Sequence, residues 1–295
     1  MTKENINIKM KRVLGDNAKV VLTKLLFPFR NKFILFNVRN KAIKNHVNID
    51  YWSEAPNLGD SISPVIVRYM LKQRGMDDKK KINETRHLYA VGSVLTAGIQ
   101  DCTVWGSGIL NANISYRVKN RKLDIRAVRG PLTQILLKDY GYLVPHVYGD
   151  PAILFPEIYT PKNIQKKYEF GLIIHKDYNI VKIISNKCII NEIKIIDIKT
   201  DDYKRFIDDI CSCEKVISSS LHGIILSEVY GVPAVLLRPQ VDLFKYFDYY
   251  YGTKRYKFPI ADTLDIALNT APISLPDFEE MRTNLKNSFP YDIYL

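Results

Sequence analysis

Residues 215–237 read KVISSSLHGIILSEVYGVPAVLL, and this stretch decides the fold class of the chain. The apolar runs at its two ends, residues 215–217 and 234–237, have the length and composition of buried strands. Residues 221–230, between them, have the length and apolar content of a packed helix. A helix of this length joins parallel strands, because antiparallel neighbours need only a short turn. The stretch therefore predicts an α/β fold built on a parallel sheet.

The same alternation of strand and helix extends along the chain in two sets, separated by a polar, basic linker at residues 162–167. The expected strands are residues 47–52, 88–92, 103–105, 125–128 and 146–148, then 170–174, 193–196, 215–217 and 234–237. The expected helices are residues 61–75, 131–141, 202–213 and 221–230. We therefore predict two Rossmann-like domains facing a cleft, residues 1–165 and 166–295. The aromatic-rich residues 244–256 are expected near that cleft or between the domains.

Composition indicates a globular protein of a reducing compartment. Apolar residues make up 46% of the 295 residues and charged residues 25%, which are ordinary values for packed domains. The scattered cysteines, Cys102, Cys188, Cys211 and Cys213, lack the spacing of a disulfide framework or a metal site. No apolar run approaches the roughly 20 residues of a spanning helix, and the start lacks the apolar core of a secretory signal. We therefore expect a cytoplasmic protein.

A formal net charge of +12 indicates a negatively charged partner. The excess is concentrated in residues 1–46, where lysines and arginines flank short apolar runs that Pro28 interrupts. Such a basic amphipathic segment is typical of an element on an anionic membrane surface. The alternative is an ordinary helix and strand packed on the first domain. Nucleic acid is not expected as a partner, because the sequence has no groove-reading motif and no basic patch with stacking aromatics.

The loop at residues 218–223, SSSLHG, lies between an expected strand and an expected helix and is the strongest candidate site. In parallel sheets, ligands bind where the carboxyl ends of strands meet helix N-termini. Unpaired N–H groups and the helix dipole there favour phosphate or carboxylate, and serines can cap the helix. His222 in the first turn would lie beside such an anion, a position suited to proton transfer. A capped helix with a surface histidine is the alternative interpretation.

Three other strand ends carry residues suited to binding. In the loop that begins at Asn57, Gly59 permits close approach of a ligand, and Asp60 either caps the next helix or orients a hydroxyl. Arg129 precedes a helix start, where a guanidinium can bind phosphate or carboxylate. Asp150, in a Gly-Asp-Pro-Ala turn, either contacts substrate or caps the following turn.

Taken in order, these loops resemble the polysaccharide pyruvyl transferase family over residues 47–240. The matching motifs are Asn57-x-Gly59-Asp60-x-Ile62, Arg129-Gly-Pro-Leu132, Gly149-Asp-Pro-Ala152, Ser218-Ser-Ser-Leu-His-Gly223 and Tyr230-Gly-Val-Pro-Ala-Val235. The resemblance implies a GT-B-like pair of domains. It also implies an enzyme that moves the enolpyruvyl group of phosphoenolpyruvate onto a sugar of a bacterial surface polysaccharide, or onto its lipid-linked precursor, and so forms a pyruvate ketal.

The resemblance assigns roles to individual residues. His222 would be the general acid that protonates the methylene carbon of phosphoenolpyruvate, and Arg129 would hold its phosphate or carboxylate. The other substrate-binding residues that it implies are Asn57, Gly59, Asp60, Asp150, Ser219, Ser220, Leu221 and Gly223. Residues 1–165 would take the sugar or polyprenyl-diphosphate-linked acceptor, and residues 166–295 the donor, with no metal or cofactor. With a lipid-linked acceptor, the enzyme would work at the inner face of the cell membrane.

The chain departs from the family pattern at two places. Many members have arginine before the Leu-His pair, where this chain has Ser220, so Arg238 or Lys254 would have to supply that anion contact. Members also often have a proline-histidine-tyrosine segment after the first strand of the second half. Here only Ile174-His175-Lys176 matches it, which makes His175 a further candidate for substrate binding.

Two other functions are compatible with the same sequence. A GT-B-type glycosyltransferase that uses a nucleotide sugar would also need glycine- and serine-bearing loops at strand ends for a diphosphate. Binding of nucleotide sugars rather than phosphoenolpyruvate would identify it. A catalytically inactive binding module of the same fold is the third function, and it would be insensitive to His222→Ala.

Overall fold

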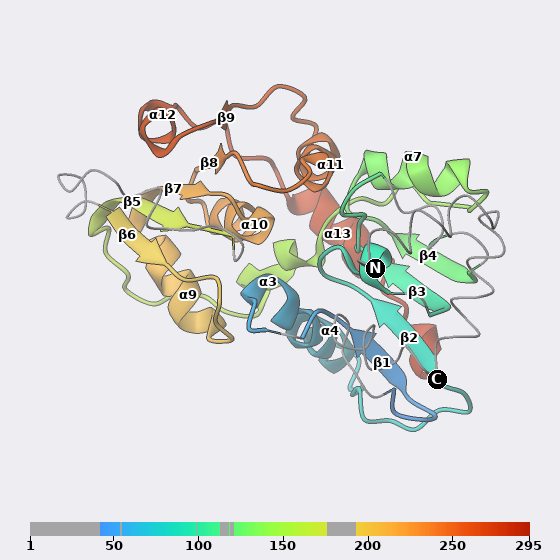
Figure 1. Cartoon of the computed structure of the whole chain (residues 1–295). Coiled ribbons are helices and arrows are strands. Elements are labelled where there is room, and N and C mark those ends of the chain that lie inside the picture. The colour runs from blue at the N-terminus through green and yellow to red at the C-terminus, as the bar shows by residue number, and fades with distance from the viewer. Residues whose placement is uncertain (1–41, 54, 99, 113–117, 119–120, 176–192) are drawn as a thin grey trace, which may run out of the picture.

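The computed structural model describes residues 42–53, 55–98, 100–112, 118, 121–175 and 193–295. Within them the chain forms two parallel β-sheets with helices packed around each (Figure 1). The α/β class predicted from the sequence is therefore confirmed. Residues 1–41, which make up most of the basic N-terminal segment, lie outside the described residues, and so does Cys188.

The first sheet has the strand order β1-β2-β3-β4, and every neighbouring pair is parallel. Its strands are β1 (Val47–Asp50), β2 (Arg86–Tyr89), β3 (Cys102–Trp105) and β4 (Leu123–Ala127). The helices of this half are α3 (Leu58–Ser61), α4 (Ser63–Lys72), α5 (Val94–Ala97), α7 (Pro131–Asp139) and the 3-10 helix η1 (Pro151–Glu157). Beyond β4, a single parallel bridge joins Val128 to Tyr148, where the sequence predicts a further strand.

The second sheet has the order β6-β5-β7-β8-β9, again with parallel pairs. Its strands are β5 (Tyr168–Ile173), β6 (Ile193–Ile196), β7 (Cys213–Ser218), β8 (Ala234–Leu237) and β9 (Ile260–Ala261), and the last was not predicted. The helices are α9 (Tyr203–Cys211), α10 (Leu221–Val229), α11 (Phe244–Gly252) and α12 (Leu264–Asn269). The chain leaves β5 for β6 on one side and reaches β7 on the other. The carboxyl ends of β5 and β7 therefore form a topological switch point, where open α/β sheets bind ligands.

Local signals place the helix ends where the sequence predicts them. Gly75 and Gly141 follow α4 and α7 with φ of 65° and 87°, the left-handed conformation that ends helices and favours glycine. Pro131 occupies the first turn of α7, and the Asp202 side chain accepts a hydrogen bond from the N–H of Arg205 at the start of α9. No helix within the described part of the chain is long and apolar enough to span a bilayer.

The C-terminal residues return to the first sheet after completing the second. Helix α13 (Glu279–Asn287) and the 3-10 helix η3 (Tyr291–Tyr294) lie beside the strands of the first half, with the C-terminus near β2 (Figure 1). The Trp105 indole donates to the carbonyl of Leu285 at 2.9 Å, and Arg126 pairs with Asp292 at 2.7 Å. Residues 279–294 therefore complete the core of the first half, although they follow the second sheet in sequence.

Leu285→Ala should lower the free energy of unfolding by about 2–5 kcal/mol, because the side chain is fully buried and its truncation leaves a cavity. Leu143→Ala is the control, since Leu143 is 94% exposed and its loss should cost less than about 0.5 kcal/mol. Urea unfolding followed by circular dichroism measures both. Equal stability of the two variants would contradict the packing of α13 on the first half.

Candidate active site

The His222 ring lies where the two halves of the chain meet. It belongs to the first turn of α10, directly after β7 and therefore at the switch point of the second sheet. The ring packs on Gly59 of α3, so closely that a Cβ at Gly59 would lie 2.0 Å from its Nδ1. A residue of the second half thus contacts helix α3 of the first, and the contact requires glycine.

Asp150 faces the other ring nitrogen. Its Oδ2 lies 3.5 Å from His222 Nε2, and its Oδ1 accepts a hydrogen bond of 3.0 Å from the N–H of Ala152 at the start of η1. One oxygen is therefore the cap that the sequence allowed, while the other points at the histidine. Within the described residues, His222 Nε2 is buried and makes no hydrogen bond. A buried polar atom without a partner is rare, and a catalytic role or a bound water or ion is the usual explanation.

Asp60 completes the group on the first-half side. Its Oδ2 accepts a hydrogen bond from Asn57 Nδ2, and its Oδ1 would lie 3.0 Å from a Cβ built on Gly92. The same Cβ would lie 3.8 Å from His222 Cε1, so the Asp60 carboxylate and the His222 ring both lie close to Gly92. Within the described residues, no group of three histidine, cysteine, aspartate or glutamate side chains is placed to hold a metal ion.

The serine loop before α10 is held by its own hydroxyl groups. Ser218 Oγ donates to the carbonyl of Ser220 at 2.9 Å and accepts from its N–H at 3.0 Å. Ser220 is the N-cap residue of α10, but its side chain does not cap the helix within the described residues. The first-turn N–H groups, from Leu221 to Gly223, therefore remain suited to an anion. A Cβ at Gly223 would lie 2.3 Å from Ser218 Oγ, so only glycine fits under this loop.

Ser219 and His175 join the ends of β5 and β7. Ser219 N–H donates to the carbonyl of Ile173 at 3.0 Å, and Ser219 Oγ accepts from the N–H of His175 at 2.8 Å. Both residues thus lie at the switch point, as the sequence predicts, and the hydrogen bonds to Ser219 fix the path of the chain there.

The family model for polysaccharide pyruvyl transferase matches residues 57–240, a range that begins at Asn57 and includes the His222 loop. The chain belongs to the polysaccharide pyruvyl transferase family. It is therefore a transferase, and membership of this family implies a polysaccharide or sugar acceptor.

The chain is also similar to two other proteins. The chain is 28% identical over 251 residues to the uncharacterized protein L143 of Acanthamoeba polyphaga mimivirus, which covers 81% of this chain and 85% of that protein. It is 25% identical over 209 residues to the succinoglycan biosynthesis protein ExoV of Rhizobium meliloti, which covers 68% of this chain and 62% of that protein.

Arg129 lies away from open space in this pyruvyl transferase. Its guanidinium is fully buried and donates to Asp248 at 3.1 Å, to Ser93 Oγ at 2.9 Å and to the carbonyl of Ile109 at 2.5 Å. A Cβ at Gly108 would lie 2.4 Å from its Cζ, so protein packs against the group as well. An anion could reach Arg129 only by displacing one of these partners.

The two cations named as substitutes for an arginine at position 220 contact other parts of the enzyme. Arg238 follows β8 and donates to the exposed carboxylate of Asp262. Lys254 Nζ lies 3.6 Å from Glu280, and both side chains are exposed. Each of these two residues therefore pairs with an exposed acid.

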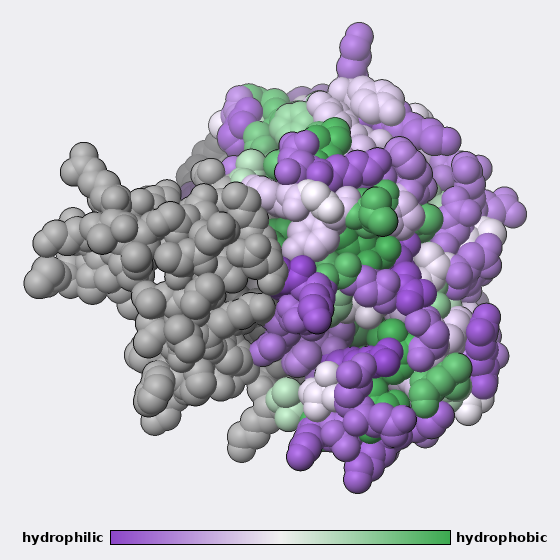
Figure 2. Space-filling model, turned by 90° about the vertical axis from the view of Figure 1, so that its right-hand side faces the viewer, coloured by the Kyte–Doolittle hydropathy of each residue, from purple (hydrophilic) through white to green (hydrophobic). Residues whose placement is uncertain are grey.

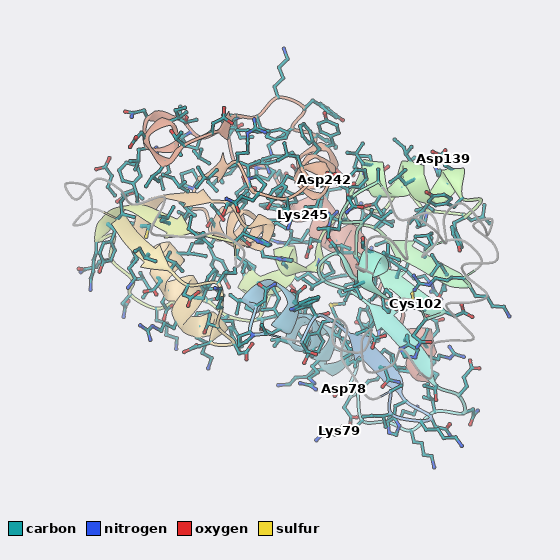
Figure 3. The ribbon with its side chains drawn as sticks, viewed as in Figure 1. Asp78, Lys79, Cys102, Asp139, Asp242 and Lys245 are labelled. Carbon is teal, nitrogen blue, oxygen red and sulfur yellow. The ribbon has the colours of Figure 1, made fainter. Side chains whose placement is uncertain are left out.

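Two residues of α11 that lie at or near the loop before α10 were not predicted from the sequence. Tyr246 donates its hydroxyl to the carbonyl of Ser219 at 2.6 Å. The preceding residue, Lys245, is 8% exposed, with Nζ 5.1 Å from the centre of the Tyr246 ring, and Figure 3 places it in the region between the two sheets. A buried lysine is uncommon in proteins and indicates an anionic neighbour. The aromatic-rich composition located this segment between the halves, but it gave no signal for these two residues.

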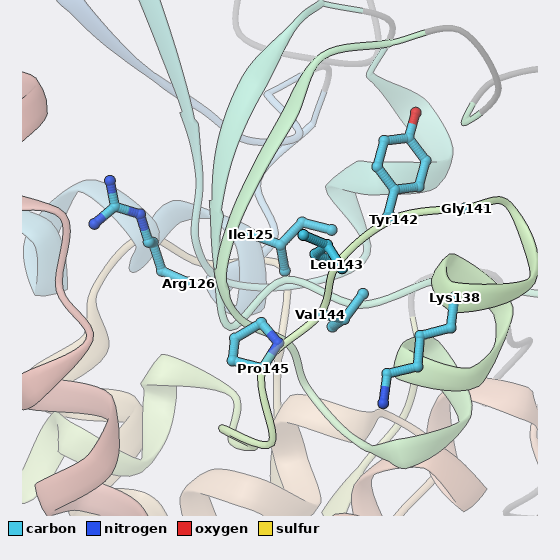
Figure 4. A pocket seen from close by; sticks show the side chains of 8 residues that line it. All are labelled: Ile125, Arg126, Lys138, Gly141, Tyr142, Leu143, Val144 and Pro145. Carbon is cyan, nitrogen blue, oxygen red and sulfur yellow. The ribbon is translucent and has the colours of Figure 1, made fainter.

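A hollow on another face lacks the groups for catalysis. It is lined by residues of β4, α7 and the following loop (Figure 4), namely Ile125, Arg126, Lys138, Gly141, Tyr142, Leu143, Val144 and Pro145. Its lining contains no histidine or carboxylate. Loops that lead from a helix into a parallel strand lie at the amino ends of the strands, opposite the ligand-binding edge. On the side of the molecule with β4 and α7, hydrophobic patches alternate with hydrophilic ones (Figure 2).

Two of the described thiols, those of Cys102 and Cys213, are buried. Burial raises the pKa of Cys102 to about 12 and that of Cys213 to about 11. Both groups stay protonated at neutral pH, and the thiolate is the reactive form. Their role is therefore to pack, as the sequence indicates.

Gly59→Ala should displace the His222 ring, because the new methyl group would occupy the place of Nδ1. The measurement is the proton NMR spectrum of the five histidine rings, in which His222 is assigned from a His222→Gln variant. Gly75→Ala is the control, because it strains a positive φ but has no atoms within 4 Å of the added carbon. The His222 signal should move in Gly59→Ala alone. An unmoved signal would contradict the contact between the two halves.

Proposed function

We propose that this enzyme transfers the enolpyruvyl group of phosphoenolpyruvate to a sugar of a surface polysaccharide or of its lipid-linked precursor. The observation that carries the proposal is the position of His222 in the first turn of α10. Its Nε2 is buried and lies 3.5 Å from Asp150 Oδ2. A proton donor beside an anion-binding helix end is the combination that this reaction requires. A GT-B-like arrangement of the two sheets would leave the donor on the second half and the acceptor on the first.

The donor has two anionic groups, and two features of the site suit them. The first-turn N–H groups of α10, at Leu221, His222 and Gly223, would bind the carboxylate or the phosphate. Lys245 would supply the positive charge that an arginine at position 220 supplies in many family members. Arg129 is less suited to this anion, because its buried guanidinium already pairs with Asp248.

The reaction needs only phosphoenolpyruvate, two hydroxyl groups of the sugar and the proton of His222. His222 donates its proton to the methylene carbon, which becomes the methyl group of the ketal, and positive charge develops at the central carbon. One sugar hydroxyl attacks that carbon, phosphate leaves it, and a second hydroxyl of the sugar closes the ketal. Of the two hydroxyl protons, one restores His222 and the other leaves with the phosphate. Asp150 stabilises the protonated imidazole throughout.

The acceptor side would be formed by Asn57 and Asp60. The hydrogen bond between their side chains fixes one oxygen of Asp60, and the other lies close to Gly92 and His222. A carboxylate there can orient a sugar hydroxyl toward the carbon that His222 activates. The related protein ExoV is named for succinoglycan biosynthesis, which supports a polysaccharide or its precursor as the acceptor. A lipid-linked acceptor would place the enzyme at the cytoplasmic face of the membrane.

His222→Gln should lower kcat by about 10²- to 10⁴-fold, because glutamine cannot donate a proton to carbon. The assay is acceptor-dependent release of phosphate from phosphoenolpyruvate. His146→Gln is the control, because His146 is exposed and contacts Tyr148 rather than the loop. Retention of the full rate by His222→Gln would remove His222 as the acid.

Lys245→Gln should raise KM for phosphoenolpyruvate about 10- to 100-fold, the effect of losing one charge-assisted contact. Lys254→Gln removes an exposed lysine just beyond the same helix and should leave KM unchanged.

Thermal shift with phosphoenolpyruvate and with nucleotide sugars tests the donor class independently, because a ligand of the folded state raises Tm. Stabilisation by a nucleotide sugar alone would identify a glycosyltransferase instead.

A further inference from the structure

Helix α11 contacts both halves of the enzyme, although it belongs to the second in sequence. On one side it packs against α7 of the first half, and on the other it reaches the loop before α10 (Figure 1). Its buried residues include Tyr246, Asp248 and Tyr249, and each of these three side chains bonds to a different element. The helix is therefore placed to fix one half relative to the other.

Asp248 anchors α11 on the first half. Its Oδ1 accepts from the N–H of Thr133 at 2.9 Å, and its Oδ2 accepts from Thr133 Oγ1 at 2.6 Å and from Arg129 Nε at 3.1 Å. Glycines allow the backbones to approach, because a Cβ at Gly130 would lie 1.9 Å from the carbonyl oxygen of Asp248 and one at Gly252 3.0 Å from that of Arg129. Asp248 thus caps the N-terminus of α7 and neutralises a fully buried arginine.

Tyr246 connects the anchored helix α11 to the loop that precedes His222. Its hydroxyl donates to the carbonyl of Ser219 at 2.6 Å, and the ring is fully buried. The N–H and hydroxyl of Ser219 are already bonded to β5 and to His175. With Tyr246 on its carbonyl, every polar group of Ser219 is held, only three residues before His222.

We propose that Tyr246 is a positioning residue for the pyruvyl transfer suggested above. By holding the Ser219 carbonyl from a helix that Asp248 anchors on the first half, Tyr246 sets the place of His222 opposite Asp150. The Tyr246 hydroxyl touches no reacting atom in this assignment. Its effect reaches the chemistry only through the loop and the first turn of α10. The expected effect on kcat rests on the proposed function, whereas the expected displacement of the His222 ring does not.

The chain provides a matched control on the same helix. Tyr249 is also fully buried, and its hydroxyl also donates at 2.6 Å, but to Glu228 in the last turn of α10. Burial raises the pKa of both tyrosines, so each hydroxyl stays a donor. Tyr246→Phe and Tyr249→Phe therefore each remove one buried oxygen and one hydrogen bond. They differ in whether that bond holds the loop that leads to His222.

The experiment measures kcat, Tm and the His222 ring signal in both phenylalanine variants of the full chain. Tyr246→Phe should lower kcat about 10- to 100-fold, the cost of a small misplacement of a catalytic group, and should move the His222 signal. Its KM for phosphoenolpyruvate should change less than kcat. Tyr249→Phe should lower Tm by a similar amount while keeping kcat within about twofold and the His222 signal unmoved.

Equal kinetics and equal His222 signals in the two variants would overturn the proposal. Asp248→Glu provides a second test, because it keeps the charge beside Arg129 but lengthens the arm that anchors α11. It should move the same His222 signal, and an unmoved signal would also overturn the proposal. If the wild-type enzyme lacks pyruvyl transfer but Tyr246→Phe still moves the signal, the positioning role stands and the proposed function fails.

Discussion

The contact between the His222 ring and Gly59 is the constraint on which the arrangement of the site depends. The missing side chain at Gly59 lets the His222 ring of α10 pack directly on the backbone of α3. At that separation Asp150, which caps a 3-10 helix of the first half, comes within 3.5 Å of the same ring. Any larger residue at position 59 would push the His222 ring out of its place beside Asp150.

Buried ion pairs at and beyond α11 fix the position of this helix relative to the first half and to α10. Asp248 pairs with Arg129 of the first half, and Arg255, just beyond the helix, forms two hydrogen bonds of 2.7 Å with Glu228 of α10. Buried ion pairs contribute little net stability over apolar packing, because desolvation offsets most of their attraction. Removing one partner, however, costs about 3–5 kcal/mol, so such pairs strongly disfavour any other packing of α11. Their effect here is to specify position rather than to add stability.

The sequence predicted most of the fold between residues 47 and 237, because short apolar runs and glycine-terminated helices are local patterns. It also predicted that His222, Gly59, Asp60 and Asp150 would lie at strand ends, and the structure brings these four together. It could not predict that Arg129 would be occupied by Asp248, which lies 119 residues away, since nothing local distinguishes a paired arginine from an open one. The short strand β9 and helix α12 were missed as well, because they are too brief to show a period.

The return of α13 to the first half has a consequence for how the protein is made. Trp105 in the first sheet bonds to Leu285, 180 residues later. The core of the first half therefore stays incomplete until the last helix has left the ribosome. Contacts of such long sequence separation slow folding, because the chain must lose loop entropy before they form. During synthesis the apolar surface beneath α13 is exposed, and such exposed surface favours aggregation of incompletely folded chains.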